Sequence, residues 1–480
     1  MIYQSRSVKP IWVTLLTEEK MAKSSLKKIG RYIEETYVKR TAESRARDRL
    51  ARNHLPGGDT RSTLYYSPYP TYMQYGSGCR LYDWDGKEYL DFLSNYASLI
   101  HGHAHPEITN AACREMEKGT IFGAPSEIQF LHADHLCQRT PGIETLRYCN
   151  SGTEATMFAI RAARAFTGKD GIIKMDGGYH GTHDVAEVNL MPDIEARGLP
   201  SYNIARGVPA CTIQDVFIAP FNDLDAVENL LSMHRDRIAA VIVEPIMGAS
   251  GLINPAPGYL KGLREITYRF DSLLIFDEII TFRLNTGGMQ AIEKTIPDLT
   301  TLGKFIGGGF PVGAFGGRKD IMAVYDPKSS EPVGHGGTFN GNNITLAAGM
   351  VALKMLDQQS IDRLNALGDR LRAGFAQALN SVGILGQITG KGSLMSLHFG
   401  VETPTNAVVA ALGARKNKEY LRLLHLQLAN FGIHTAPRGM YIVSTPMSER
   451  EIDRAMAAFE ETLDLLKPAI SENRPDLIMT

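Results

Sequence analysis

The chain has 480 residues, 44% of them hydrophobic, and its 51 lysines and arginines nearly balance its 52 aspartates and glutamates. A net charge of -1 gives no field that would collect nucleic acid or an anionic membrane. The length exceeds the roughly 250 to 300 residues at which a single hydrophobic core stops growing. The five cysteines show neither the density of a disulfide scaffold nor the spacing of a zinc site. The sequence therefore favours small-molecule chemistry in a cytoplasmic protein of more than one domain.

The first hundred residues divide into an extension, a helix and short strands. The apolar run at residues 11–16 is shorter than a signal-peptide core, and no stretch reaches the ~20 apolar residues of a membrane span. We interpret residues 1–20 as a disordered extension. Helical spacing predicts an exposed amphipathic helix over residues 24–53. Turn signals within residues 72–93 predict short antiparallel strands.

Beyond residue 101, runs that are apolar at nearly every position alternate with helical segments. Such runs predict strands covered on both faces, as in a mostly parallel sheet. The runs are residues 146–149, 171–175, 216–219, 239–243, 273–276 and 312–315.

From about residue 350 this pattern fades. Residues 353–379 and 451–466 read as amphipathic helices, and residues 394–399 and 441–443 as shorter strands. We therefore predict an α/β protein with a large domain over residues 101–350. A small α+β domain is expected from residues 351–480, together with the strands of residues 21–100.

The informative residues follow the apolar runs, because ligands of open parallel sheets bind beyond the carboxyl ends of the strands. Ser151, Gly152 and Thr153 follow the first run and open a helix, whose free N–H groups, hydroxyls and dipole suit a phosphate. A plain helix cap by Ser151 or Thr153 explains the same residues. Tyr179, between glycines, can stack on a planar cofactor or fill a gap at a turn.

Carboxylates follow two further runs, and a lysine lies among glycines after them. Glu244 and Asp277 each end a run, and an aspartate in that place can hold a proton on a ring nitrogen. Lys304 lies among glycines that allow a flat ligand to approach. Burial lowers the pKa of a lysine, so that its amine can form a Schiff base with an aldehyde. A solvated lysine in a surface loop is the alternative.

The spacing of residues argues against two other functions, nucleoside triphosphate hydrolysis and metal binding. An acidic pair after a buried strand is also typical of nucleoside triphosphatases, but their phosphate loop requires serine or threonine after the lysine. Here Phe305 follows Lys304. His101, His103 and His105 alternate as metal ligands might on a strand, but a glycine and a proline interrupt them. We interpret them as local turn structure and expect no metal site.

The motifs at residues 151–154, 178–180, 244–245 and 277–278 and the Lys304 loop occur in this order. Together they resemble the class III, fold-type I aminotransferases, which use pyridoxal phosphate. The resemblance implies a large domain with a seven-stranded type of sheet. It also implies that Lys304 carries the cofactor as an internal aldimine and later moves the proton, and that Asp277 pairs with the pyridine nitrogen. Tyr179 and Ile279 would sandwich the ring, and Glu244 would lie near the cofactor or substrate.

The resemblance implies a phosphate site and an assembly as well. Ser151, Gly152 and Thr153 would hold the cofactor phosphate, and Thr338 of the partner subunit would complete the site. A homodimer with its active sites at the interface follows from that analogy. A regulator that binds pyridoxal phosphate and DNA is the rival outside enzymology. Residues 1–60 are too short for its DNA-binding head and show no helix-turn-helix.

The lysine loop looks closest to glutamate-1-semialdehyde 2,1-aminomutases and β-amino acid aminotransferases. Arg61 stands earlier than the arginine of the aminomutases, and segment 56–70 is similar to the β-phenylalanine type of aminotransferase. Arg438 matches the arginine that those transaminases use for a carboxylate. Because arginine forks bind carboxylates bidentately, we expect Arg61 to bind the β-amino acid and Arg438 to bind 2-oxoglutarate or pyruvate. A surface ion pair is the alternative for each.

Residues 94–100 and 122–127 match the β-phenylalanine type poorly. We expect them to line the side-chain pocket, with Tyr96 as a substrate-binding residue. The amino donor is therefore an aromatic or aliphatic β-amino acid, or an amine without a carboxylate. The expected activity is a ping-pong transamination through pyridoxamine phosphate. Intramolecular amino transfer by an aminomutase is the alternative.

Overall fold

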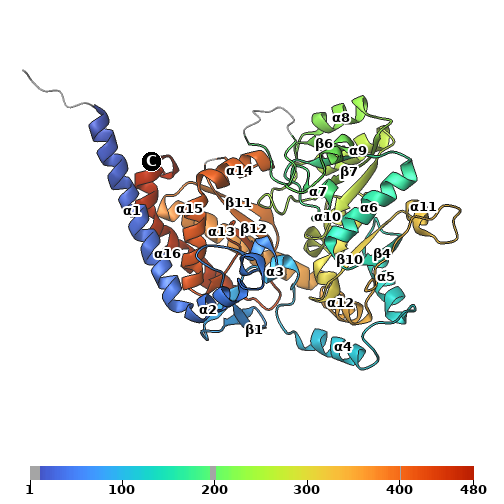
Figure 1. Ribbon diagram of the computed structural model, residues 1–480, viewed down its shortest axis with the longest axis horizontal. Coiled ribbons are helices and arrows are strands. Elements are labelled where there is room, and N and C mark those ends of the chain that lie inside the picture. The colour runs from blue at the N-terminus through green and yellow to red at the C-terminus, as the bar shows by residue number, and fades with distance from the viewer. Residues whose placement is uncertain (1–10, 195–201, 401) are drawn as a thin grey trace, which may run out of the picture.

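The computed structural model describes residues 11–194, 202–400 and 402–480, and three β-sheets organise that part of the chain. A seven-stranded sheet lies on one side of the molecule (Figure 1). A four-stranded and a three-stranded sheet lie on the other side, among helices from both ends of the chain (Figure 1).

The seven-stranded sheet has the strand order β4-β10-β9-β8-β7-β5-β6. β10 pairs antiparallel with β4 and β9, and the other pairings are parallel. The predicted α/β fold with a mostly parallel sheet is confirmed. The strands are β4 (Thr145–Cys149), β5 (Gly171–Met175), β6 (Val216–Ala219), β7 (Ile238–Val243), β8 (Leu273–Asp277), β9 (Leu299–Gly303) and β10 (Gly313–Gly317).

The sequence did not predict β9, and it placed the last strand at residues 312–315 instead of Gly313–Gly317. β9 contains Thr300 and Thr301, which interrupt the apolar pattern of a buried strand. Both threonines are nevertheless buried, because their hydroxyls bond to Gln290 and Asp277. A buried hydroxyl is tolerated where it has a partner.

Helices cover both faces of this sheet. Ile172 and Ile242 pack into one apolar cluster with α6, whereas their neighbours Ile173 and Val241 pack into another with α8 and α9. Successive side chains of a strand point to opposite faces, so this alternation places a core on each side. The helices are α4 (Pro106–Met116), α5 (Glu127–Arg139), α6 (Gly152–Thr167), α7 (Asp184–Glu187), α8 (Leu224–Met233), α9 (Tyr259–Arg269), α10 (Gly288–Ile292), α11 (Lys319–Met322) and α12 (Asn343–Met355).

The two smaller sheets combine both ends of the chain. β1, β2 and β3 form the antiparallel strands predicted within residues 72–93, and β13 pairs in parallel with β3. The N-terminal and C-terminal segments thus share one sheet, while the boundaries of the domains stay a prediction. The strands are β1 (Met73–Ser77), β2 (Arg80–Asp83), β3 (Glu88–Asp91) and β13 (Ile433–His434), and in the other sheet β11 (Gly386–Lys391), β12 (Leu394–Phe399) and β14 (Met440–Ile442).

The helix predicted over residues 353–379 is two helices. α12 ends at Met355 and α13 begins at Gln358, because the Asp357 side chain accepts a hydrogen bond from the Ser360 N–H and caps the second helix. The helix predicted at residues 451–466 lies within a longer one, α16. The remaining helices are α1 (Ile11–Arg40), α2 (Ala42–Ala51), α3 (Ser94–Ala97), α13 (Gln358–Val382), α14 (Ala407–Lys416), α15 (Lys418–Asn430) and α16 (Glu449–Asn473).

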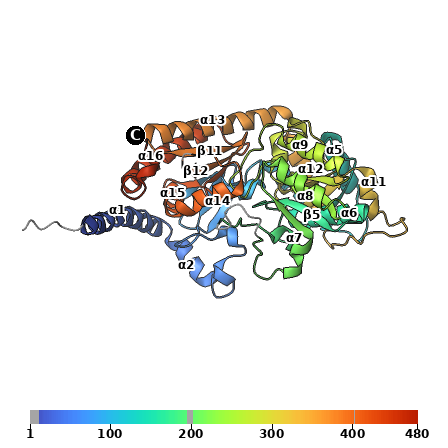
Figure 2. The ribbon, with the colours of Figure 1, turned by 90° about the horizontal axis from the view of Figure 1, so that it is seen from above.

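The exposed helix predicted over residues 24–53 is wrong in two respects. It is divided into α1 and α2 at Thr41, and α1 is docked, since Ile33 and Tyr37 are buried in the same apolar cluster as residues of α15 and α16. Figures 1 and 2 show α1 on the side away from the central sheet. Residues 11–20, expected in a disordered extension, are helical, and residues 1–10 lie outside the described residues. Within the described residues, no helix has the length and apolar character needed to cross a bilayer.

Ile33 tests the docking of α1. Its side chain is 0% exposed, so Ile33→Ala should lower the free energy of unfolding by about 2 to 5 kcal/mol through lost burial and a cavity. The neighbouring Tyr32 is 57% exposed, and Tyr32→Ala should change that free energy by no more than about 0.5 kcal/mol. Urea titrations of both variants measure the difference. Equal effects would mean that α1 does not dock in solution.

Candidate active site

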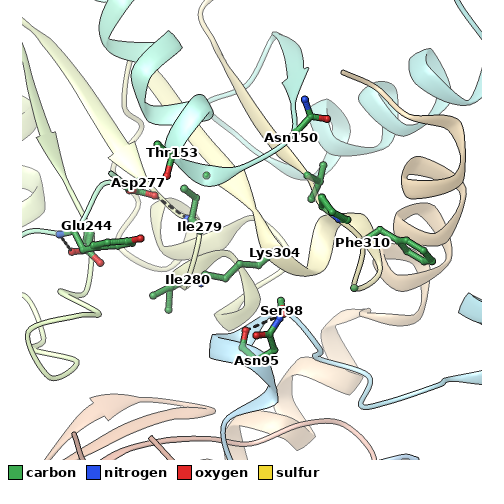
Figure 3. Close-up of a pocket in the computed structure, with 16 residues that line it drawn as sticks. Asn95, Ser98, Asn150, Thr153, Glu244, Asp277, Ile279, Ile280, Lys304 and Phe310 are labelled. Carbon is green, nitrogen blue, oxygen red and sulfur yellow. Dashed lines mark hydrogen bonds between the residues drawn. The ribbon is translucent and has the colours of Figure 1, made fainter. Parts of the chain in front are cut away.

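A cavity of about 330 Å³ opens beyond the carboxyl ends of the central strands (Figure 3). Asn150 follows β4, Tyr179 follows β5 and Glu244 follows β7, while Asp277 ends β8 and Lys304 follows β9. Because β10 is antiparallel, the segment before it, residues 309–312, reaches the same edge and completes the wall. Residues from five strands of one sheet thus meet around a single cavity.

Lys304 lies at the centre of this arrangement, not in a solvated loop. Its backbone has a φ of 56°, a left-handed conformation that a residue with a side chain rarely adopts. Burial lowers the pKa of its amine to about 8, against the opposing charges of Asp277 and Glu244. The amine is therefore partly neutral near physiological pH, which a nucleophile or proton carrier requires.

Asp277 is 4% exposed, and three donors hold its carboxylate. Oδ1 accepts from the hydroxyl of Thr301 at 3.1 Å and from the N–H of Ile279 at 3.2 Å. Oδ2 lies 2.9 Å from Nδ1 of His180, which must donate because a carboxylate only accepts. Burial lowers the pKa of His180 despite this bond, so its ring is neutral. The carboxylate is thus fixed in orientation for a cationic partner in the cavity.

Glu244 holds two loops at the edge of the cavity. Its Oε1 accepts from the N–H of Tyr179 at 2.9 Å, and its Oε2 accepts from the N–H of Gly248 at 2.9 Å. Burial and the nearby charge of Asp277 raise the pKa of Glu244 to about 8, although both backbone bonds oppose the shift. Tyr179 is thereby tied to the wall through its backbone, while its ring stays partly exposed and lines the cavity.

The N-terminus of α6 points at the same cavity. Ser151 is the helix cap, since its Oγ accepts from the N–H of Glu154, and Gly152 and Thr153 line the cavity. A Cβ at Gly152 would lie 2.6 Å from Cδ1 of Ile279, so a larger residue there would force the Ile279 side chain to move. Backbone N–H groups of a first turn and the helix dipole together favour an anion.

The other predicted residues, Arg61, Tyr96, Thr338 and Arg438, do not line the cavity within this chain. Arg61 and Arg438 are exposed, and Tyr96 lies beside them. Burial raises the pKa of Tyr96, while the positive charges of Arg438 and Arg61 act to lower it, so both guanidiniums are near this phenol. Thr338 is exposed and does not line the cavity within this chain.

Sequence reasoning missed several residues of the site. His180 stood in a recognised motif but received no role, and Thr301 lay in the strand that was not predicted. Of the two segments expected to line the side-chain pocket, residues 94–100 contribute Asn95 and Ser98, whereas residues 122–127 do not reach the lining. The role of Thr301 could have been predicted only from the strand register, because Thr301 of β9 pairs with Asp277 of β8.

A family model described as Aminotransferase class-III matches residues 65–463, so the chain belongs to the class III aminotransferases. A glutamate-1-semialdehyde 2,1-aminomutase from Methanothermobacter thermautotrophicus is 39% identical over 425 residues, covering 87% of this chain and 98% of that protein. The crystal structure of an omega-transaminase from Sphaerobacter thermophilus superimposes with a TM-score of 0.86 at 41% identity, covering 88% and 98% of the two chains. A beta-phenylalanine aminotransferase from Variovorax paradoxus gives a TM-score of 0.83 at 35% identity, covering 93% and 98%.

Pyridoxal phosphate is the cofactor of this family and of this chain. The residues of the cavity fit it. An oriented carboxylate, Asp277, can face a protonated ring nitrogen, and the Lys304 amine can face an aldehyde. The first turn of α6, at Gly152 and Thr153, can receive a phosphate.

The lowered pKa of Lys304 gives a pH prediction. Only a neutral amine attacks an aldehyde, so the rate at which cofactor-free protein takes up pyridoxal phosphate should rise with pH. Its half-maximum should lie near pH 8, not near the ordinary lysine value of 10.5. Absorbance after rapid mixing measures this rate, and Lys304→Ala is the control that should show no covalent uptake. A half-maximum near pH 10 would mean that the amine is solvated.

Proposed function

We propose that this protein is a transaminase that moves an amino group from a β-amino acid to a 2-oxo acid such as 2-oxoglutarate or pyruvate. The observation that carries the proposal is the pair of arginines near Tyr96, Arg61 from the N-terminal segment and Arg438 from the C-terminal segment. A donor and an acceptor that bind in turn each bring a carboxylate. An arginine fork binds a carboxylate bidentately, so two forks serve two such substrates.

Solved relatives support a transaminase. The omega-transaminase and the beta-phenylalanine aminotransferase are 41% and 35% identical to this chain and cover most of it. The second is a β-amino acid enzyme by its description, which agrees with the position of Arg61 in the sequence. Tyr96, whose hydroxyl donates to the Thr63 carbonyl at 2.9 Å, links the segment of Arg61 to the cavity wall.

In this proposal each residue of the cavity has a separate role in the reaction. When bound, pyridoxal phosphate supplies an electron sink for the reacting substrate carbon. Asp277, oriented by His180 and Thr301, would hold a proton on the ring nitrogen. Lys304, with a pKa of about 8, can give or take a proton at the substrate carbon near neutral pH. Glu244 fixes the backbone of Tyr179, whose ring, with the Ile279 side chain, would hold the cofactor ring.

The assembly belongs to the same proposal. Ser151, Gly152 and Thr153 hold the phosphate, and Thr338 of the partner subunit completes the site in a homodimer. The exposure of Thr338 in this chain is compatible with that role. We place the protein in the cytoplasm, where its five free cysteines would stay reduced.

The second candidate is a glutamate-1-semialdehyde 2,1-aminomutase, which moves the amino group within one molecule. Curated relatives of that description, such as the one from Methanothermobacter thermautotrophicus, are 36 to 39% identical to this chain. An intramolecular transfer needs no oxo acid. The two candidates therefore differ in whether a second substrate is required.

A half-reaction separates the candidates. Mixing the holoenzyme with a panel of β-amino acids should convert the absorbance of the bound cofactor, and added 2-oxoglutarate or pyruvate should restore it. Glutamate-1-semialdehyde should not yield 5-aminolevulinate in the absence of an oxo acid. Turnover of the semialdehyde alone, with no response to the β-amino acids, would establish the aminomutase instead.

Arg438 gives a sharper test of the acceptor site. Arg438→Ala should raise the KM for the oxo acid by well over tenfold, the loss expected of roughly 1.5 to 3 kcal/mol for a charged hydrogen-bonded pair. Arg269→Ala is the matched control, because Arg269 is an exposed arginine of α9 that pairs with Glu228. Steady-state kinetics with varied oxo acid measures both. An unchanged KM in Arg438→Ala would refute the role of Arg438.

A further inference from the structure

The four residues of α3 form a left-handed turn built without glycine. The φ angles of Ser94, Asn95, Tyr96 and Ala97 are 47°, 47°, 55° and 72°. Residues with a Cβ avoid this region, and left-handed conformations normally occur at single positions. Strained backbone persists where the surroundings over-determine it, and it collects at sites that need exact placement.

A buried carboxylate at the end of β3 holds the turn. Asp91 is 2% exposed, and its Oδ1 accepts from the N–H groups of Leu93 and Ser94, each at 2.9 Å. Its Oδ2 lies 2.7 Å from Nε2 of His103. Burial alone would raise the pKa of Asp91, but the bond from His103 and the nearby His434 hold it below its usual value. A charged carboxylate therefore fixes the entry to the left-handed turn.

The turn brings Asn95 between Arg61 and the cavity. Asn95 lines the cavity together with Lys304 and Asp277 (Figure 3). Its Oδ1 accepts from Nη2 of Arg61 at 2.5 Å. Arg61 lies next to the site, because its guanidinium bonds to Asn95, which lines the cavity, and its guanidinium carbon lies 5.9 Å from the centre of the Tyr96 ring.

One bond to Asn95 leaves the guanidinium able to bind a ligand. Arginine has five N–H donors, and Asn95 accepts from one nitrogen only. Within the described residues Arg61 forms no salt bridge, whereas Arg52, nine residues earlier, pairs with Asp48. An amide oxygen orients the fork without neutralising it. A carboxylate in the place of Asn95 would compete with the substrate.

We propose that Asn95, held in the left-handed turn by Asp91, is the positioning residue that fixes Arg61 for the carboxylate of the amino donor and so determines the preference for carboxylate-bearing donors. This inference rests on the proposed function, in which Arg61 binds the donor. Asn95 acts through Arg61 and takes no part in proton transfer. Its loss should therefore change donor binding much more than the rate of the bound complex.

The test compares donors that differ only in a carboxylate against a methyl group. The pairs are 3-aminobutanoate with butan-2-amine, and 3-amino-3-phenylpropanoate with 1-phenylpropan-1-amine. Asn95→Gly keeps the left-handed backbone but removes the amide. It should raise the KM for the reactive β-amino acid roughly tenfold, leave its kcat within about twofold, and leave the KM of the matching amine unchanged. Asn95→Asp should raise the KM for the acid further, because its charge occupies the Arg61 fork.

A double-mutant cycle tests whether Asn95 acts only through Arg61. Arg61→Ala with Asn95→Gly should be no worse for the β-amino acid than Arg61→Ala alone, since both changes remove one function. Lys294→Gly is the matched control for relief of left-handed strain, because Lys294 is exposed with a φ of 50° and does not line the cavity. Melting temperatures of both glycine variants should be no lower than that of the parent protein.

The outcomes are distinct. If Arg61→Ala removes the preference for the acid and Asn95→Gly does not, or if Asn95→Asp binds the acid better than Asn95→Gly, the inference is overturned and the proposed function stands. If the parent enzyme accepts no β-amino acid, or Arg61→Ala leaves its KM unchanged, the proposed role of Arg61 fails and the inference fails with it. A parallel loss in KM for acid and amine would also overturn it, because that result indicates a general structural role.

Discussion

The carboxylate of Asp277, buried at the end of β8, is the interaction on which the site depends. A charge with so little exposure is stable only when donors surround it, and here the hydroxyl of Thr301, the N–H of Ile279 and the ring of His180 do so. Two of these donors come from other elements, so the carboxylate ties β8 to β9 and to the loop after β5. The same burial that requires these bonds lowers the pKa of Lys304, which follows β9 directly.

The antiparallel direction of β10 links the start of α6 and the Lys304 segment at the same edge of the sheet. Since β10 runs antiparallel between β4 and β9, Gly313 pairs with both Cys149 and Gly303. A Cβ at Gly313 would lie 2.0 Å from the carbonyl oxygen of Ser151, so glycine lets the start of α6 lie against the strand. The anion-binding end and the lysine end are thereby held at a fixed separation by a single rigid sheet, which suits a cofactor with a phosphate at one end and an aldehyde at the other.

The residues that line the cavity and the two arginines that we propose to bind the substrates come from different parts of the chain. Asp277 ends a strand of the seven-stranded sheet and Lys304 follows another, whereas Arg61 and Arg438 come from segments nearer the two ends of the chain. The strained α3 turn lies between them and brings Asn95 to the wall. Left-handed non-glycine residues cost about 1 to 3 kcal/mol each, a cost that the bonds to Asp91 offset locally.

The sequence by itself determined the fold class, the cofactor and the residues at the strand ends. An apolar run followed by a polar residue is a local pattern, and a parallel sheet gathers the ends of its strands at one edge, so Glu244 and Asp277 could be predicted from order alone. Lys304 was predicted from the glycines around it instead. Strand β9, the role of His180 and the docking of α1 could not be predicted, because each depends on a partner far away in the chain. Thr301 reads as an interruption until β8 lies beside it, and Ile33 reads as exposed until α15 and α16 cover it. Tertiary structure alone decided these points, since hydrogen-bond partners and packing partners are set by register and by the meeting of distant segments.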